Sequence, residues 1–450
     1  MQSRVYRYFL YTCIFELATI GVSGWMQSYV TEKVNAQEAT ANSQTQSEFG
    51  RETLSAARAR ELVRKSTDKM GLSLDNLEEL DAEIAAILSE SRGKLSLDGL
   101  QALDEDSAEI LTKNPNLAIS LNGLTSITPK TAASLSRLRF LALNHLKADA
   151  AVLRELGQAE GIVQLNSLES LEAQAAADLV KRPRILSLDG LKSISADVAK
   201  ELAASRASFS LNGIEDLTDE AAGAIATRPG GWSFASLKRL QHVGLAVAIA
   251  TESRGVDLRQ LDTVSLECLV ALAECPHIVT LGMKELTKEQ AEVLSKCKRY
   301  LTLNRLPKIT DDAIESLLQS NCALRLPALR ELNNVELAER LIKNSGSMLD
   351  VLVLESLSEP IAKVFTTRKV ILPLYRVTAI DLATAKILAE HPGNLILSGL
   401  KEMSYEQAEI FAARQGKLHL SSETVMSDKA RVMLAANKMI SWKVKQKIQP

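Results

Sequence analysis

Side chains that could carry out catalysis or hold a metal ion are few and scattered along this 450-residue chain. The five cysteines form no CxxC pair, and neither they nor the five histidines have the spacing of a zinc site. No GxSxG, HExxH, glycine-rich phosphate loop or Cys/His dyad occurs, and His419 has no obvious acidic partner. We therefore expect a protein that is not an enzyme and that uses no metal or cofactor.

A recurring row of Asp and Asn residues offers oxygen atoms in register and could form a ladder of calcium ligands. The row mixes neutral Asn with Asp, and glycine follows several members, which is typical of tight turns. We expect turns, with a calcium ladder as the alternative. The row consists of Asp98, Asn122, Asn144, Asn166, Asp189 and Asn212.

The elements that carry this row repeat from Leu72 onward. The clearest copies are Leu95-Ser-Leu-Asp-Gly-Leu100 and Leu186-Ser-Leu-Asp-Gly-Leu191. We take the second apolar residue of each Leu-x-Leu as the origin of a unit. Sixteen origins then span 74 to 420, with a mean period of about 23 residues, inside the ~20–29 range of leucine-rich repeats. The origins are 74, 97, 121, 143, 165, 188, 211, 234, 258, 281, 303, 326, 354, 374, 397 and 420.

The period fails at one place, where 28 residues separate origins 326 and 354 and 20 separate 354 and 374. An insertion there predicts a protruding loop at Lys343–Ser347, and such loops sometimes bind ligands. Degenerate spacing without function is the other interpretation.

Each unit combines two hydrophobic periods. Leu-x-Leu alternates as a short strand does, and a helix-capping residue follows seven residues after most origins. Ala then recurs eleven residues after the origin and a large apolar residue fourteen after it, which places both on one helix face. The units therefore predict one strand and one helix each. The predicted caps are Asp104, Thr128, Ser195, Thr218, Thr310, Ser404 and Ser427, with capping boxes at Thr287/Gln290 and Ser404/Gln407.

This pattern resembles the leucine-rich repeat, and is most similar to the cysteine-containing type with Leu in place of the Cys, as at Leu100, Leu124, Leu168 and Leu191. The resemblance covers about 72 to 436. It implies an α/β horseshoe with a parallel sheet on the concave face, helices on the convex face, and a role in holding another molecule.

The two ends differ from the repeats. Arg4 and Arg7 precede the apolar stretch Phe9–Val30, so residues 1–36 predict a cleaved signal peptide or a single membrane anchor, although Glu16 interrupts the pattern. Residues 37–50 predict a flexible linker, 51–71 a helical cap, 72–436 the solenoid, and 437–450 a cap strand with a basic tail. We expect export to the periplasm, cell surface or medium; a cytoplasmic protein is the alternative.

The residue before each origin points away from the core, so these residues predict the concave surface. They are mostly serine in the first eight units and chemically diverse from 257 to 420. In the later units they are Asp257, Thr280, Thr302, Arg325, Val353, Pro373, Ile396 and His419, and their neighbours include Arg259, Arg305, Tyr375 and Arg376. Arg and Tyr dominate interface hot spots, so the later units are the candidate binding surface, with sequence drift as the alternative. The candidate residues are Asp257, Arg259, Arg305, Arg325, Tyr375, Arg376 and His419.

The charge balance narrows the class of partner. Lys and Arg number 53 against 55 Asp and Glu, which argues against nucleic acid. We therefore expect a non-enzymatic module that binds a protein or a cell-envelope component; a structural spacer or a cytoplasmic adaptor are the alternatives. Cys275 and Cys297 occupy equivalent positions of adjacent units, where we expect free buried thiols, although an exported chain could bond them.

Overall fold

A computed structural model describes residues 54–66, 71–251, 255–350 and 353–443. The predicted signal or anchor segment and the linker lie outside these residues. The chain forms two compact units, one of residues 54–168 and 178–187 and the other of 169–177 and 188–443. None of the helices in the described ranges is both long and apolar enough to cross a bilayer.

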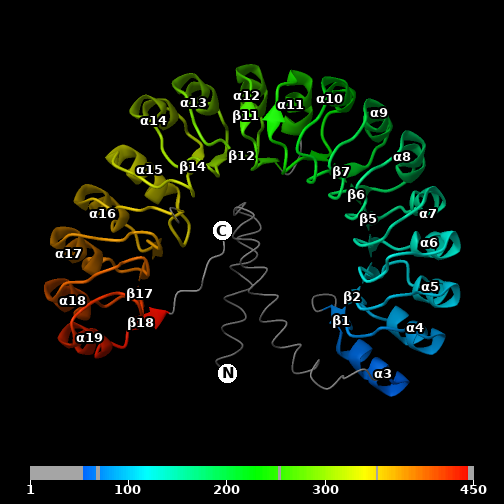
Figure 1. Ribbon diagram of the computed structural model, residues 1–450, viewed down its shortest axis with the longest axis horizontal. Helices are drawn as coiled ribbons and strands as arrows, with labels where there is room; N and C mark the ends of the chain where they lie inside the picture. Colours follow the sequence, from blue (N-terminus) through cyan, green and yellow to red (C-terminus); the bar gives the residue numbers. More distant parts are fainter. Residues whose placement is uncertain (1–53, 67–70, 252–254, 351–352, 444–450) are drawn as a thin grey trace. The chain divides into compact units, whose positions relative to one another are not determined.

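The first unit alternates strands and helices. Its strands β1 to β6 pair in sequence order and in parallel, with residues two before successive origins in register, as for Leu72 and Leu95. The strands line the inner side of the unit and the helices its outer side (Figure 1). Its elements are α3 (Ala56–Lys65), β1 (Leu72–Ser73), α4 (Ala82–Ser89), β2 (Lys94–Ser96), α5 (Glu105–Leu111), β3 (Ala118–Ser120), α6 (Pro129–Leu135), β4 (Phe140–Ala142), α7 (Ala150–Leu156), β5 (Ile162–Gln164) and β6 (Ile185–Ser187).

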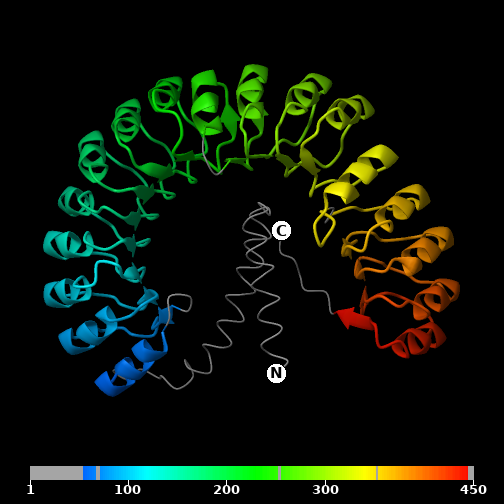
Figure 2. The same cartoon turned by 180° about the vertical axis from the view of Figure 1, so that it is seen from behind.

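The second unit has the same alternation, with parallel groups β7–β8, β10-β12-β13-β14 and β15-β16-β17-β18, and a separate pair β9–β11. Figure 2 shows the same layering from behind. Its strands are β7 (Ser208–Ser210), β8 (Trp232–Ser233), β9 (Arg239–Leu240), β10 (Val256–Leu258), β11 (Thr263–Val264), β12 (Ile278–Leu281), β13 (Tyr300–Leu303), β14 (Ala323–Arg325), β15 (Leu372–Pro373), β16 (Leu395–Leu397), β17 (Leu418–Ser421) and β18 (Ile440–Lys443).

The helices of the second unit cover the outer side of its strands. They are α9 (Ala196–Ala204), α10 (Asp219–Ala226), α11 (Val243–Ala250), α12 (Leu266–Ala273), α13 (Lys288–Leu294), α14 (Asp311–Leu318), α15 (Val335–Asn344), α16 (Glu359–Phe365), α17 (Leu382–Glu390), α18 (Tyr405–Ala412) and α19 (Asp428–Ala435). Helix α8 (Ala173–Leu179) contributes residues to both units.

The predicted helix starts are confirmed. The side chains of Asp104, Thr128 and Ser195 accept hydrogen bonds from the amides three residues later, as do those of Thr218, Ser404 and Ser427. Both capping boxes form. Thr310 stands at the N-cap of α14 but makes no capping hydrogen bond with its side chain.

The core lies between the strand layer and the helix layer, as the sequence predicts. Ala108 and Leu111, eleven and fourteen residues after one origin, are both fully buried, and so are their equivalents Ala408 and Phe411. The small alanine allows each helix to lie close to its strand.

The repeat origin predicted at 354, between origins 326 and 374, is wrong. Met348 bridges to Ile371 and the Leu349 amide donates to the Ile371 carbonyl, which aligns Leu349 with Leu372 and restores a period of 23 residues. Two extra residues, rather than five, precede this unit. They lengthen helix α15 to 10 residues, so that Lys343 and Asn344 are helical instead of forming a protruding loop.

Four cysteines of the described chain are buried and free, which confirms the prediction made for Cys275 and Cys297. Burial raises the pKa of the Cys297 thiol to about 12, and the neighbouring Cys322 and Cys275 add to this effect. Because the thiolate is the reactive form, we expect Cys268, Cys275, Cys297 and Cys322 to resist alkylation by iodoacetamide in the native chain and to react after denaturation. Peptide mapping by mass spectrometry measures this, and disulfide-linked peptides would contradict it.

Candidate functional site

The inner side of the earlier repeats carries a regular ladder of hydrogen bonds. The candidate binding surface lies on the later repeats, where other residues take the place of this ladder. In the first unit, the Asp98 carboxylate accepts from the Ser120 hydroxyl at 2.7 Å and from the Asn122 amide at 2.9 Å. Asp75 accepts in the same way from Ser96 and from the Asp98 amide. Each Asp or Asn thus joins its own repeat to the next, and we call this arrangement the Ser–Asp ladder.

The second unit continues the Ser–Asp ladder for two steps. Asp189 accepts from the Ser210 hydroxyl at 2.7 Å, and Asn212 accepts from the Ser233 hydroxyl and the Ala235 amide at 2.9 Å each. The side-chain oxygens of Asp98, Asn122, Asn166, Asp189 and Asn212 accept from protein donors, so the ladder accounts for these members of the Asp/Asn row. The Oδ1 of Asn144 is buried and accepts no hydrogen bond from the described residues. Among the described residues no group of three or more His, Cys, Asp or Glu could hold a metal.

The hydrogen bonds of the ladder also affect the pKa of Asp98. Burial would raise the pKa of Asp98, but hydrogen bonds from Ser120, Asn122 and Ser96 outweigh this effect and lower the pKa below its ordinary value. Asp98 therefore stays ionised at neutral pH and its ladder remains intact.

The turns form as predicted, and the glycines in them provide space. Gly99, Gly123 and Gly213 do not have positive φ angles; a Cβ at Gly123 would stand 2.4 Å from the carbonyl oxygens of both Asp98 and Leu100. Glycine fits at these three positions because the backbones of successive turns touch, rather than because of the turn conformation.

From β10 onward, the strand positions that hold serine in the ladder hold other residues. Asp257 lies beside Thr280 in the strand register, Thr280 beside Thr302, and Thr302 beside Arg325. A second stretch runs from Pro373 through Ile396, His419 and Ser441. We call these residues, together with Asp350, the inner row of the second unit.

At the start of the inner row, Asp257 and Arg259 take the two positions that Ser and Asp occupy in the ladder. The Arg259 Nε donates to both carboxylate oxygens of Asp257, at 3.0 and 3.1 Å. This hydrogen bonding raises the pKa of Arg259, against the effect of burial. Roughly a third of each side chain is exposed, so an incoming partner can contact the pair.

The middle of the inner row combines an aromatic ring with charges. The Arg325 guanidinium lies 5.6 Å from the centre of the Tyr300 ring, and Arg299 approaches the same ring at 5.7 Å. Burial raises the pKa of Asp350, and the nearby charge of Arg325 opposes this rise. Tyr300 and Asp350 were not among the predicted residues, and the corrected register replaces Val353 by Asp350 in the row.

The other predicted residues lie apart from this cluster. Arg305 lies in the turns, where its Nη1 donates to the Asp262 carboxylate at 3.0 Å, and Lys284 contacts the same carboxylate. Tyr375 and Arg376 are exposed in the turn after β15. The His419 ring is hydrogen-bonded to the Ser441 hydroxyl. The predicted residues therefore follow one surface but do not converge on a point.

Side chains alternate along a strand, so the residue three before each origin faces the same side as the residue one before it. A second row could have been predicted from these residues. Ile278, Tyr300 and Ala323 are adjacent on β12, β13 and β14, and Met348 is adjacent to Ile371 farther along. All five are half-buried. An apolar row therefore runs beside the charged inner row, and this combination suits a protein surface better than a small polar ligand.

A second set of hydrogen bonds lies at the outer ends of the repeats, seventeen residues after the origins. In these positions a side chain donates to carbonyls that end the preceding helix: Asn437 Nδ2 donates to Ala412 and Arg414 at 2.9 Å each, and Arg228 Nη1 to Ser205 and Ala207 at 2.7 Å each. We call these residues the helix-end clamps. They stabilise contacts between neighbouring repeats.

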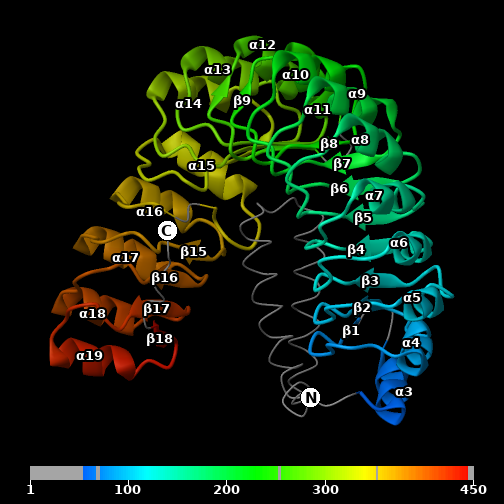
Figure 3. The ribbon, with the colours of Figure 1, turned by 45° about the vertical axis from the view of Figure 1, so that its right-hand side comes forward.

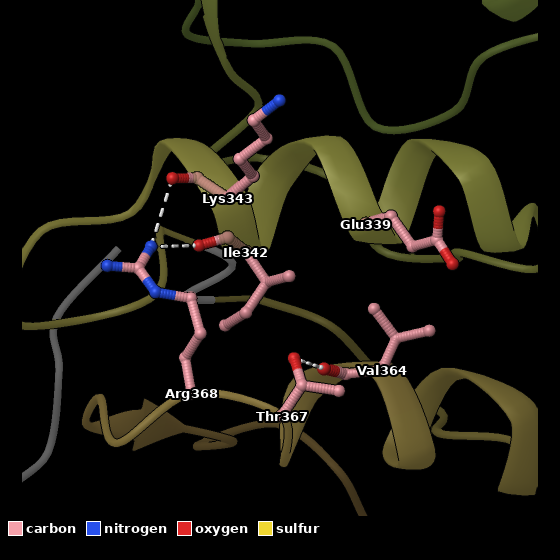
Figure 4. A pocket seen from close by; sticks show the side chains of 6 residues that line it. All are labelled: Glu339, Ile342, Lys343, Val364, Thr367 and Arg368. Atoms are coloured by element: carbon pink, nitrogen blue, oxygen red, sulfur yellow. Dashed lines mark hydrogen bonds between the residues drawn. The ribbon is translucent and has the colours of Figure 1, made fainter.

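Arg368 is the helix-end clamp of α15. Its Nη1 donates to the Ile342 and Lys343 carbonyls at 2.6 and 2.9 Å, as Figure 4 shows. It borders an open hollow of about 430 Å³ between α15 and α16, which Glu339, Val364 and Thr367 also line. The polar end of Arg368 is engaged with backbone carbonyls, so the hollow follows from the packing of two helices.

No family model matches the chain, and no curated protein matches it. Solved structures that are similar to it include the following two. One is a leucine-rich-repeat protein of Leptospira interrogans, with 14% identity over 88% of this chain and 100% of that chain and a TM-score of 0.43. The other is an internalin of Listeria monocytogenes, with 13% identity over 87% of this chain and 95% of that chain and a TM-score of 0.34. By repeat length, parallel register and strand–turn–helix order, both units of this chain fold as leucine-rich-repeat solenoids.

Proposed function

We propose that the chain is a non-enzymatic module that binds a protein or a cell-envelope component on the inner row of its second unit and on the adjoining turn residues Tyr375 and Arg376. The observation that supports this best is the end of the Ser–Asp ladder at Asn212 and Ser233. Up to that point the inner serines bind ladder oxygens. Beyond it, Asp257, Arg325 and the turn residue Tyr375 present charge and aromatic surface at positions that the ladder no longer occupies.

A spacer without a ligand would have no need for this change. A hydrogen-bonded ladder joins repeats whatever the partner, and its replacement by chemically different residues removes those bonds. The apolar row beside Tyr300 adds an area that water solvates poorly. Charged groups around an apolar centre are the usual composition of a protein interface.

The test uses the full chain as bait, with wild type compared against the triple variant Arg325→Ala/Tyr375→Ala/Arg376→Ala. We expect a partner captured by wild type to bind the triple variant at least about tenfold more weakly, since hot-spot residues contribute ~2 kcal/mol or more each. Arg137→Ala, an exposed arginine of the first unit, is the matched control and should bind as wild type does.

Equal affinity of wild type and the triple variant for the captured partner would refute the assignment to the inner row. Failure of the wild-type chain to retain any partner from its own cell envelope or medium would favour the spacer.

We propose further that the protein is exported. Arg4, Arg7 and the apolar stretch Phe9–Val30 support this through their likeness to a signal peptide. N-terminal sequencing of the protein isolated from its own cells tests the proposal. A mature end near Gln37 or Asn42 is the expected result, and an intact start in a cytoplasmic fraction would contradict it.

A further inference from the structure

The outer side of the second unit carries an apolar surface that the proposed function does not use. Helices α11 and α12 lie side by side there, as Figures 1 and 3 show. Val243 and Val247 of α11 are 44% and 47% exposed, and Leu266 and Val270 of α12 are 42% and 46% exposed. We call these four residues the α11–α12 patch.

These four residues occupy the outward ridge of their helices, at the first and fifth helical positions. Other helices place charged residues there, such as Lys288 and Glu292 on α13 or Asp311 and Glu315 on α14. Helix α11 has no charged residue at all. Three of the four patch residues are valine, which is disfavoured in helices, so neither solubility nor helix propensity explains them.

The patch stands on a reinforced part of the solenoid. Strands β9 and β11 lead directly into α11 and α12, and they pair in parallel with Arg239 opposite Thr263 and Leu240 opposite Val264. This extra pairing fixes the starts of the two helices relative to each other. A partner therefore meets a preformed surface, which reduces the entropy lost on binding.

Negative charge flanks the patch. The adjacent helices α10 and α13, with α12 itself, carry five carboxylates and one lysine, although the whole chain is close to neutral. Some of these acids stabilise the first turn of their own helix, but Glu292 lies beyond the first turn. The carboxylates are Asp219, Glu220, Glu267, Glu289 and Glu292.

We propose that the α11–α12 patch is a docking surface for an amphipathic helix of a partner protein, with apolar residues on one face and lysine or arginine beside them. The apolar face covers the four patch residues, and the basic residues meet the flanking carboxylates. A helix fits because apolar side chains three and four residues apart match two parallel ridges. This surface is independent of the inner row.

The test uses the full chain and a fluorescent helical peptide of leucine and lysine, with fluorescence anisotropy as the measurement. We expect the double variant Val247→Gln/Val270→Gln, which removes apolar surface without changing the charge, to bind this peptide at least about tenfold more weakly than wild type, a loss of about 1.4 kcal/mol. The matched control is Val432→Gln, at the fifth position of α19, which is 72% exposed and should bind as wild type does.

A second peptide, with glutamate in place of lysine, separates charge complementarity from general apolar binding. We expect it to bind wild type at least about tenfold more weakly than the lysine peptide. Equal binding of the two peptides, or equal binding of the lysine peptide to wild type and the double variant, would overturn the proposal. So would wild-type dimers in sedimentation that the double variant abolishes, because a second copy would then occupy the patch.

Discussion

Replacing Arg414 with alanine should lower the free energy of unfolding by about 3 kcal/mol or more. Arg414 is a helix-end clamp that is 3% exposed, and its guanidinium donates to the carbonyls of Leu388, Ala389 and Gly393. Each buried acceptor that loses its donor costs about 1–3 kcal/mol, and the deleted side chain also leaves a space. Burial already lowers the pKa of Arg414 to about 10, which reflects how little water reaches it.

Guanidinium-induced unfolding followed by circular dichroism measures this loss. Arg92→Ala, at an exposed arginine, is the control and should change the stability by less than about 0.5 kcal/mol. Arg414→Lys should fall between the two, because one ammonium group cannot reproduce the fork that spans separate carbonyls. Superimposable curves for Arg414→Ala and Arg92→Ala would contradict the role of the clamp.

Replacing Gly123 with alanine should destabilise the chain by about 1–3 kcal/mol. The added Cβ would stand 2.4 Å from two backbone carbonyl oxygens, which cannot rotate away as a flexible side chain could. Moving the turn would in addition stretch the hydrogen bond between Asp98 and the Asn122 amide.

Gly346→Ala is the matched control, because no atom lies within 4 Å of a Cβ built there. It should leave the unfolding midpoint unchanged or raise it slightly through a less flexible unfolded chain. His145 and Ser167 occupy positions equivalent to Gly123, and their side chains bond to the carbonyls of Asn122 and Leu146. Ala328 occupies the equivalent position after origin 326, so the expected loss comes from the contacts of Gly123 itself, and a stable Gly123→Ala variant would mean that its turn is less tightly packed than the structure indicates.

Most of this fold can be predicted from the sequence because several signals within each unit indicate the same strand and the same helix. Leu-x-Leu, the cap, Ala and the following apolar residue agree with one another in units such as those of Leu97 and Leu397. Agreement fails near Leu349, where Leu, Val and Leu follow one another closely and allow more than one Leu-x-Leu. Only the strand pairing of Met348 with Ile371 decides between them.

The hydrogen bonds between neighbouring repeats could be predicted less well than the fold. The helix-end clamps include Asn114, Arg228, His391 and Asn437, which share only the ability to donate a hydrogen bond, so they show no repeated residue type. Arg305 was predicted as a neighbour of the row and lies in the turn after β13, but its ion pair with Asp262 could not be predicted, because Asp262 comes from an earlier repeat.

The Ser–Asp ladder has a consequence for how such a chain can change in length. Repeats with a complete Ser–Asp pair offer the same acceptor to their successor and the same donors to their predecessor, as Asp75, Asp98 and Ser120 illustrate, whereas Ala142 and Gln164 replace the serine in two repeats. A repeat with the complete pair could therefore be duplicated or removed, and the new neighbours would still find matching groups. After Ser233 the bonds are particular to each pair of repeats, so the same exchange would leave groups such as Asp262 without their counterparts. Recombination could therefore exchange repeats more easily in the early part of the chain than in the region proposed to bind the partner.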